Sequence, residues 1–241
     1  YSKKLEAKGI ESFEGMLIAG IYHLKNNKND EAFKYFKKLK KNYQQEDVIR
    51  SLVSTSLENW ITFSESKKRD DALYLIEKMP TKFKNIKKIQ STFVECFFES
   101  NFTEKAFKKL IFDKEANFSR YSFFYSNYLN SKGKSEEAID IINESLKDNP
   151  RNLILNQFKT EINNKKTVNF NNEFNCRNLS HVSAEILYIA ANLLSSEHSF
   201  VLSNFYLSLA KYLNPNFISF DTLYAENFYM MNRLEKAKKI Y

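Results

Sequence analysis

Glycine and proline are scarce in this chain, which has only 4 Gly and 3 Pro among 241 residues. Tight hairpin turns and phosphate-binding loops need glycine at positive φ, so this scarcity argues against folds built on either. An apolar fraction of 43% with 27% charged residues is typical of a chain that folds around a hydrophobic core. The composition therefore predicts an all-α protein.

Cysteine and histidine are also rare, and their positions indicate no reactive or metal-binding site. Cys96 and Cys176 are the only cysteines, and without the close spacing of a zinc or redox motif they are expected to be free, buried thiols. The three histidines show no paired spacing, and no glycine-rich loop or nucleophile elbow occurs. The sequence predicts a non-enzyme with no catalytic, cofactor-binding or metal-binding residues.

Long hydrophobic runs are absent, and the basic charge has an ordinary origin. The longest mostly apolar stretch, 186–194, is far shorter than the roughly 20 residues that span a bilayer, so no transmembrane segment is expected. The net charge of +8 comes mainly from lysine, in a chain also rich in Asn, Ile, Phe and Tyr. Such a composition is typical of AT-rich codons, and we expect no specific nucleic-acid partner.

What the chain does contain is an internal repeat. In five segments an acidic residue stands two places before an alanine, as at a helix start, where the acid favours the positive end of the helix dipole. Thr103 and Ser135 are placed to cap two of these helices. We use these alanines as markers of the second helix in each pair. A residue that is usually small stands twelve positions before each of them, as closely packed antiparallel helices require, and a sixth pair has a serine in place of the alanine. The paired markers are Gly20 with Ala32, Trp60 with Ala72, Val94 with Ala106, Ser126 with Ala138, Ala191 with Ser203, and Ala225 with Ala237.

The period of about 34 residues, with Ser126, Ala138 and Pro150 at the small, small and proline positions, resembles the tetratricopeptide repeat (TPR). The resemblance implies a right-handed α-solenoid of antiparallel helix pairs, in which each unit contacts only its neighbours. Trp60 departs from the pattern, so we expect the first helix of its unit to be extended or bulged. The six units lie near residues 13–44, 48–80, 84–114, 118–150, 184–216 and 218–241.

The repeat divides the chain into four parts. Residues 1–12 are expected to be the N-terminal flank of an excerpt, and 13–164 hold four units plus one extra helix after Pro150. Residues 165–178 are expected to form an Asn-rich loop, and 179–241 hold the remaining units, the last one truncated. The layout is similar to long bacterial TPR proteins that are exported. That resemblance favours the periplasm or cell envelope over the cytoplasm, while the compartment itself stays open.

In a stack of this kind, the first helix of each unit lines a concave groove, with groove-facing residues three and four apart. Asn127 and Asn192 hold the same place in their units, and an amide there can pair with the backbone of a bound peptide. Aromatic neighbours would supply apolar contacts. The predicted peptide-binding groove comprises Arg120, Phe123, Asn127, Asn130, Tyr188, Asn192, Glu226 and Tyr229.

The resemblance and the groove together predict a non-enzymatic scaffold that binds a protein, through a peptide or a partner helix. Two alternatives stay open: the structural arm of a larger enzyme or envelope assembly factor, and a nucleic-acid-binding helical repeat. The second would gather Lys and Arg inside the groove. The predicted groove residues are instead mainly amide, aromatic and acidic.

Overall fold

The computed structural model describes residues 12–43, 47–113, 118–164 and 174–240. Over these residues the chain is all-α, with 13 α-helices packed in contact and no strand. The helices from the first part of the chain are α2 (Phe13–Lys25), α3 (Asn29–Tyr43), α4 (Val48–Ser66), α5 (Arg69–Glu77), α6 (Lys84–Phe97), α7 (Thr103–Ile111), α8 (Arg120–Ser131), α9 (Ser135–Asp148) and α10 (Leu153–Asn163), with a 3-10 helix, η1 (Thr81–Phe83), before α6. The later helices are α11 (Leu179–Ser196), α12 (Phe200–Leu213), α13 (Ser219–Met230) and α14 (Leu234–Lys238).

Two helices lie in each of the six predicted units, although α11 begins at Leu179, ahead of the predicted start near 184. Helix α10 is the extra helix expected after Pro150. The first helix of the second unit, α4, is extended as expected, with 19 residues against 13 in α2. Trp60 is fully buried there, and its indole N–H donates to Gln90 Oε1 at 3.2 Å. Most of the predicted Asn-rich loop, 165–173, lies outside the described residues.

The turn inside each helix pair repeats in geometry. Each carries one residue with positive φ, and five of these stand five positions before the small marker of the second helix. In five of the turns a backbone N–H donates to the carbonyl five residues earlier, the bond that closes a helix ending with a left-handed residue. The repeat is therefore present in backbone conformation as well as in sequence. The positive-φ residues are Asn27, Lys67, Glu99, Gly133, His198 and Asn232.

The capping roles predicted for Thr103 and Ser135 are wrong. The N-cap positions are Phe102 and Lys134, and neither side chain caps its helix. Thr103 Oγ1 instead donates to the carbonyl of Glu95 at 2.8 Å, on the preceding helix. Each turn enters its second helix one residue earlier than the sequence suggests, so these hydroxyls face the first helix of the pair rather than the free amides.

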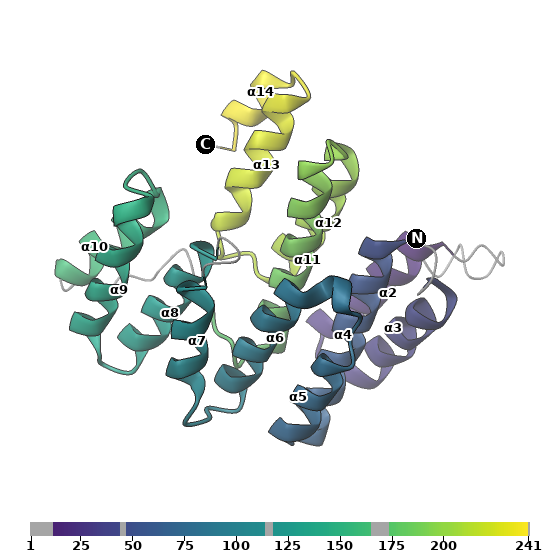
Figure 1. Ribbon diagram of the computed structural model, residues 1–241. Coiled ribbons are helices and arrows are strands. Elements are labelled where there is room, and N and C mark those ends of the chain that lie inside the picture. Colours follow the sequence, from purple (N-terminus) through teal and green to yellow (C-terminus); the bar gives the residue numbers. More distant parts are fainter. Residues whose placement is uncertain (1–11, 44–46, 114–117, 165–173, 241) are drawn as a thin grey trace.

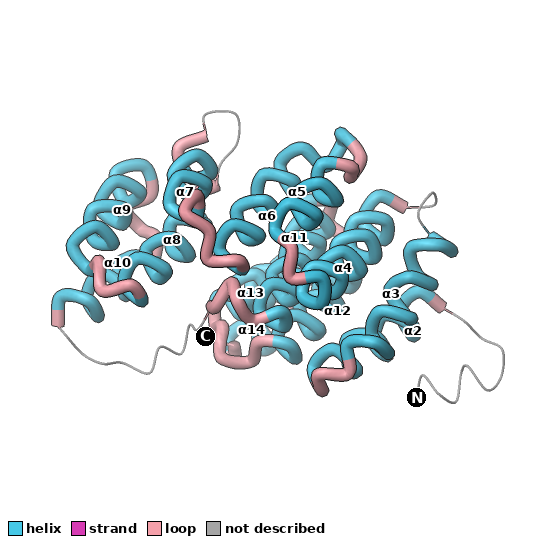
Figure 2. The backbone as a smooth tube through the Cα atoms, turned by 90° about the horizontal axis from the view of Figure 1, so that it is seen from below, coloured by secondary structure: helices cyan, strands magenta, loops and turns pink. Residues whose placement is uncertain are grey.

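Some helix pairs also contact pairs that are far from them along the chain, contrary to the expectation that each unit contacts only its neighbours. Figure 1 shows α2 to α10 following one another along an arc, with the later helices α11 to α14 rising from within it. Helix α11 packs against α4, and α12 packs against α2. In Figure 2 α11 lies beside α4. The C-terminal ends of α2 and α12 meet where Lys25 Nζ donates to the carbonyl of Leu213 at 2.9 Å.

Helix α11 packs against α4 because α4 is buried on most of its circumference. A helix with an apolar or small residue on every side needs neighbours on every side. Helices α3 and α5 cover two sides of α4, and α11 covers a third. Ser51 and Ser54 are almost completely buried on α4, and small side chains of this kind allow close helix packing.

The close approach of α2 and α3 at Gly20 can be tested by substitution. A Cβ at this position would lie 2.4 Å from Cε1 of the fully buried Phe36. We expect Gly20→Ala to lower the free energy of unfolding by about 1 to 3 kcal/mol, because the ring has no room to retreat. Urea denaturation followed by circular dichroism measures the loss.

Phe36→Leu, combined with Gly20→Ala, is the control for this prediction. The smaller side chain removes the ring that clashes, so the double variant should be more stable than the sum of the two single losses implies. Strict additivity of the two losses would contradict the clash as the cause.

Candidate functional site

The first helix of each N-terminal pair contacts the C-terminal part of the same chain, and we call the surface formed by these first helices the inner face. Helix α2 packs on α12 and α4 on α11. On α6, the Phe93 ring packs in a tilted arrangement against Phe174, which precedes α11, with ring centroids 5.3 Å apart. On α8, Arg120 forms an ion pair with Glu185 of α11. Residues 174–220 therefore occupy the inner face of the arc.

The expectation of free thiols is wrong, because Cys96 and Cys176 form a disulfide with a Cα–Cα distance of 5.9 Å. Cys96 lies near the end of α6, and the fold brings residue 176 beside it from 80 positions away. Both residues are buried. The bond ties the segment that leads into α11 onto the inner face, and the Arg177–Glu99 ion pair supports it nearby.

Arg120 is the centre of a polar cluster between α8, α11 and α13. Its Nε and Nη2 donate to the two carboxylate oxygens of Glu185, each at 2.8 Å, and Nη1 donates to Ser219 Oγ at 2.6 Å. The guanidinium also lies 3.7 Å from the ring centroid of Tyr188, a cation–π contact. Burial lowers the pKa of Arg120, but the Glu185 carboxylate outweighs burial and holds that pKa above its ordinary value. Arg120 and Tyr188 thus join helices of this chain.

Three further residues of the predicted groove are likewise engaged inside the molecule. Phe123 is buried against Phe158 and Phe217. Asn127 Nδ2 donates to the carbonyl of Phe174 at 2.9 Å, so its amide binds a backbone, but that of its own chain. Asn130 Oδ1 accepts from Ser135 Oγ at 2.9 Å. The structure therefore places the predicted groove residues of α8 in internal contacts.

The predicted residues near the C-terminal end are exposed instead. Asn192 lies on the surface of α11, and Glu226 and Tyr229 lie on α13. Glu226 and Tyr229 also line a hollow of about 880 Å³ between the α11–α12 turn and the α13–α14 pair. We call it the C-terminal groove. It is lined by Ser195, Ser196, His198, Phe200, Ala225, Glu226, Tyr229, Met230, Leu234, Ala237 and Lys238.

Three large apolar side chains are exposed together in the C-terminal groove. Tyr229 is 65% exposed, Met230 57% and Leu234 44%. Isolated exposed apolar residues are common on protein surfaces, but several lining one hollow mark a binding surface. Glu226 adds a carboxylate, and partial burial raises its pKa above the ordinary value.

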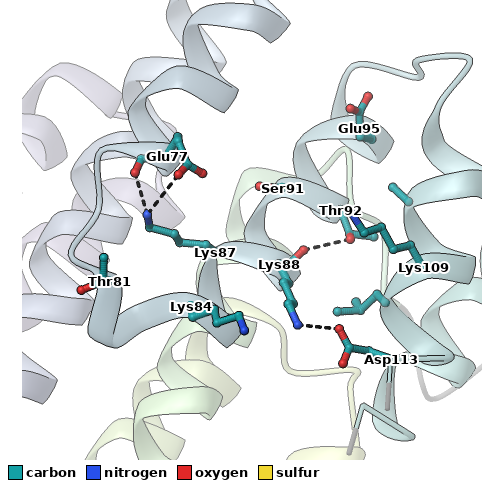
Figure 3. A pocket seen from close by; sticks show the side chains of 12 residues that line it. Glu77, Thr81, Lys84, Lys87, Lys88, Ser91, Thr92, Glu95, Lys109 and Asp113 are labelled. Carbon is teal, nitrogen blue, oxygen red and sulfur yellow. Dashed lines mark hydrogen bonds and ion pairs between the residues drawn. The ribbon is translucent and has the colours of Figure 1, made fainter. Parts of the chain in front are cut away.

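A second hollow, of about 470 Å³, lies between α5, α6 and α7 and gathers four lysines (Figure 3). Figure 3 shows Lys87 reaching Glu77 and Lys88 reaching Asp113 within the same hollow. Lys88 Nζ donates to Asp113 at 2.5 Å, and Lys87 Nζ donates to the carbonyl of Glu77 at 2.6 Å. Glu95, also in the lining, pairs with Arg69. Two of the four lysines are thus engaged by Glu77 and Asp113, which weakens the attraction of this hollow for a polyanion.

No group of His, Cys, Asp and Glu that could hold a metal ion occurs in the described ranges. His181 Nδ1 accepts from the backbone N–H of Asn175 at 3.1 Å, and burial lowers the pKa of this imidazole to about 4. Across the described helices, none combines the length and hydropathy needed to cross a bilayer.

The comparisons with known proteins assign no family to the chain. No protein-family model matches it, and no curated protein matches it either.

Proposed function

We propose that this chain is a non-enzymatic scaffold of the TPR-like class, a right-handed α-solenoid of antiparallel helix pairs, and that it binds a protein partner. The recurring pairs, the small markers and the repeated turns support this class. The observation that carries the binding role is the C-terminal groove, where Tyr229, Met230 and Leu234 are exposed together beside Glu226. Because residues 174–220 fill the inner face elsewhere, the partner binds at this end of the molecule.

The disulfide supports an oxidising compartment, such as the periplasm, as the place where the scaffold works. Disulfides persist in exported proteins and are rare in the reducing cytoplasm. Cys96 and Cys176 are both buried, so the bond is shielded from reductants in its surroundings.

Site-specific photo-crosslinking in the cell that makes the protein tests the proposed role. Benzoylphenylalanine in place of Tyr229 should give adducts with one or a few proteins, because the side chain faces the groove. Tyr74 on α5 is the matched control, since it is 61% exposed and lies outside the groove. Mass spectrometry identifies the adducts, and adducts formed equally at 74 and 229, or at 74 alone, would argue against the groove.

A further inference from the structure

We propose that the C-terminal groove binds an amphipathic helix that presents a lysine or arginine to Glu226. This inference rests on the proposed scaffold function and specifies the partner's chemistry. It follows from three properties of the groove: which walls it has, which of its polar groups are already engaged, and which charge is left without a partner.

The walls of the groove favour a helix over an extended peptide. Both sides are built from helices and their turn, and the backbone amides and carbonyls from Ala225 to Met230 lie inside α13. An extended peptide that binds by strand addition needs the backbone hydrogen bonds of a sheet edge, and the lining of this groove contains none. A helix needs only side-chain contacts, and its apolar residues at spacings of three and four suit a hollow lined by Tyr229, Met230 and Leu234.

The two serine hydroxyls of the groove are already engaged within the chain. Ser195 Oγ donates to Asn227 Oδ1 at 2.6 Å, and Ser196 Oγ donates to the carbonyl of Leu193 at 2.7 Å. They are poorly placed to select a polar peptide. Apolar contact therefore supplies most of the attraction, as at the centre of other helix-in-groove interfaces.

The charges of the groove select a basic partner. Lys238 Nζ pairs with Glu235 at 3.2 Å, and the His198 ring packs on Phe200. Glu226 has no ion pair or hydrogen bond with any part of the chain that the structure describes. Its carboxylate lines the hollow, so a cation brought by a bound partner is shielded from water there and gains more than on an open surface.

Selection of helical peptides against the full chain tests the inference. A displayed library with one randomised helix face should yield clones that combine an apolar stripe with a Lys or Arg beside it. Affinities of the selected peptides, measured by fluorescence anisotropy, should fall about fivefold on Glu226→Gln, the size expected for one partly screened ion pair. They should fall at least about tenfold on Tyr229→Ala, because that change removes an aromatic anchor.

Matched variants outside the groove are the controls. Glu136→Gln on α9 removes an exposed carboxylate, and Tyr74→Ala on α5 removes an exposed ring, so both should leave affinity unchanged. The reversed variant Glu226→Lys should select acidic helices in place of basic ones.

The outcomes separate this inference from the scaffold function. Two results would contradict the proposed ion pair with Glu226 but not the groove as the binding site. They are selected helices that lack a basic residue, and basic helices whose affinity is unchanged by Glu226→Gln. Peptides that bind but ignore both Glu226→Gln and Tyr229→Ala would move the binding surface elsewhere and leave the scaffold role. A library that yields no binder, together with no adduct at position 229, would overturn both.

Discussion

Reduction of the Cys96–Cys176 disulfide should lower the free energy of unfolding by about 4 kcal/mol. The bond closes a loop of 80 residues, and opening a loop of this length releases a large conformational entropy in the unfolded chain. Reduction also releases the segment that holds Phe174. The ring centroid of Phe174 lies 4.3 Å from that of Phe124 on the inner face. Urea denaturation with and without a phosphine reductant measures the loss.

Alanine variants separate the covalent bond from the packing of the two side chains. Cys96→Ala, Cys176→Ala and the double variant should all unfold near the reduced wild type, and none should respond to the reductant. Alkylation of the unreduced wild type after unfolding in urea should modify neither cysteine. Two alkylated cysteines in that sample would show that the thiols are free after all.

Replacing Arg120 by methionine should cost about 3 to 5 kcal/mol, because it leaves the completely buried Glu185 carboxylate without its cation. Within the described ranges, the only other hydrogen-bond partner of that carboxylate is Tyr121 Oη, at 3.4 Å. The double variant Arg120→Met with Glu185→Leu should recover most of the loss, since well-packed apolar residues often replace a buried ion pair without penalty. Thermal and urea unfolding of the three proteins checks both statements.

The pH dependence of Arg120→Met gives a signature that simple loss of packing lacks. Without the cation, the buried Glu185 side chain is less costly to hold as a neutral acid than as a carboxylate, because an unpaired buried charge is strongly unfavourable. The variant should therefore lose less stability in acid than at neutral pH. Lys147→Met, which breaks an exposed ion pair with Glu144, should cost less than about 1 kcal/mol and show no such recovery.

The helix pairs could be predicted from the sequence because their signals are local. Gly20 and Ala32 mark one close approach, Ser126 and Ala138 another, and all four residues are buried. Small residues twelve apart reflect a contact between consecutive helices, which a short turn brings together. The predicted starts of the second helices were less accurate, as Thr103 and Ser135 show. The turn residue with positive φ fixes where the second helix begins.

The contacts across the inner face could not be predicted in the same way. Arg120 and Tyr188 both fit the pattern of groove-facing residues, and the periodicity that placed them there says nothing about what fills the groove. Cys96 and Cys176 are 80 positions apart and form no sequence motif, so their pairing could not be predicted. Only the return of α11 onto the arc brings them together. Tyr229 and Glu226 follow the same periodicity, yet they line an open hollow and remain exposed.

The return of α12 onto α2 has a consequence for the order in which the protein matures on the ribosome. In an open repeat array, each unit is complete once the next one has emerged. Here the Lys25–Leu213 contact spans 188 positions, and the first helix pair gains its last neighbour only when most of the chain has been made. Contacts of such high sequence separation slow folding and leave apolar surface uncovered meanwhile. Nascent chains that stop before α11 would expose the inner face of the arc, the kind of surface that folding helpers recognise.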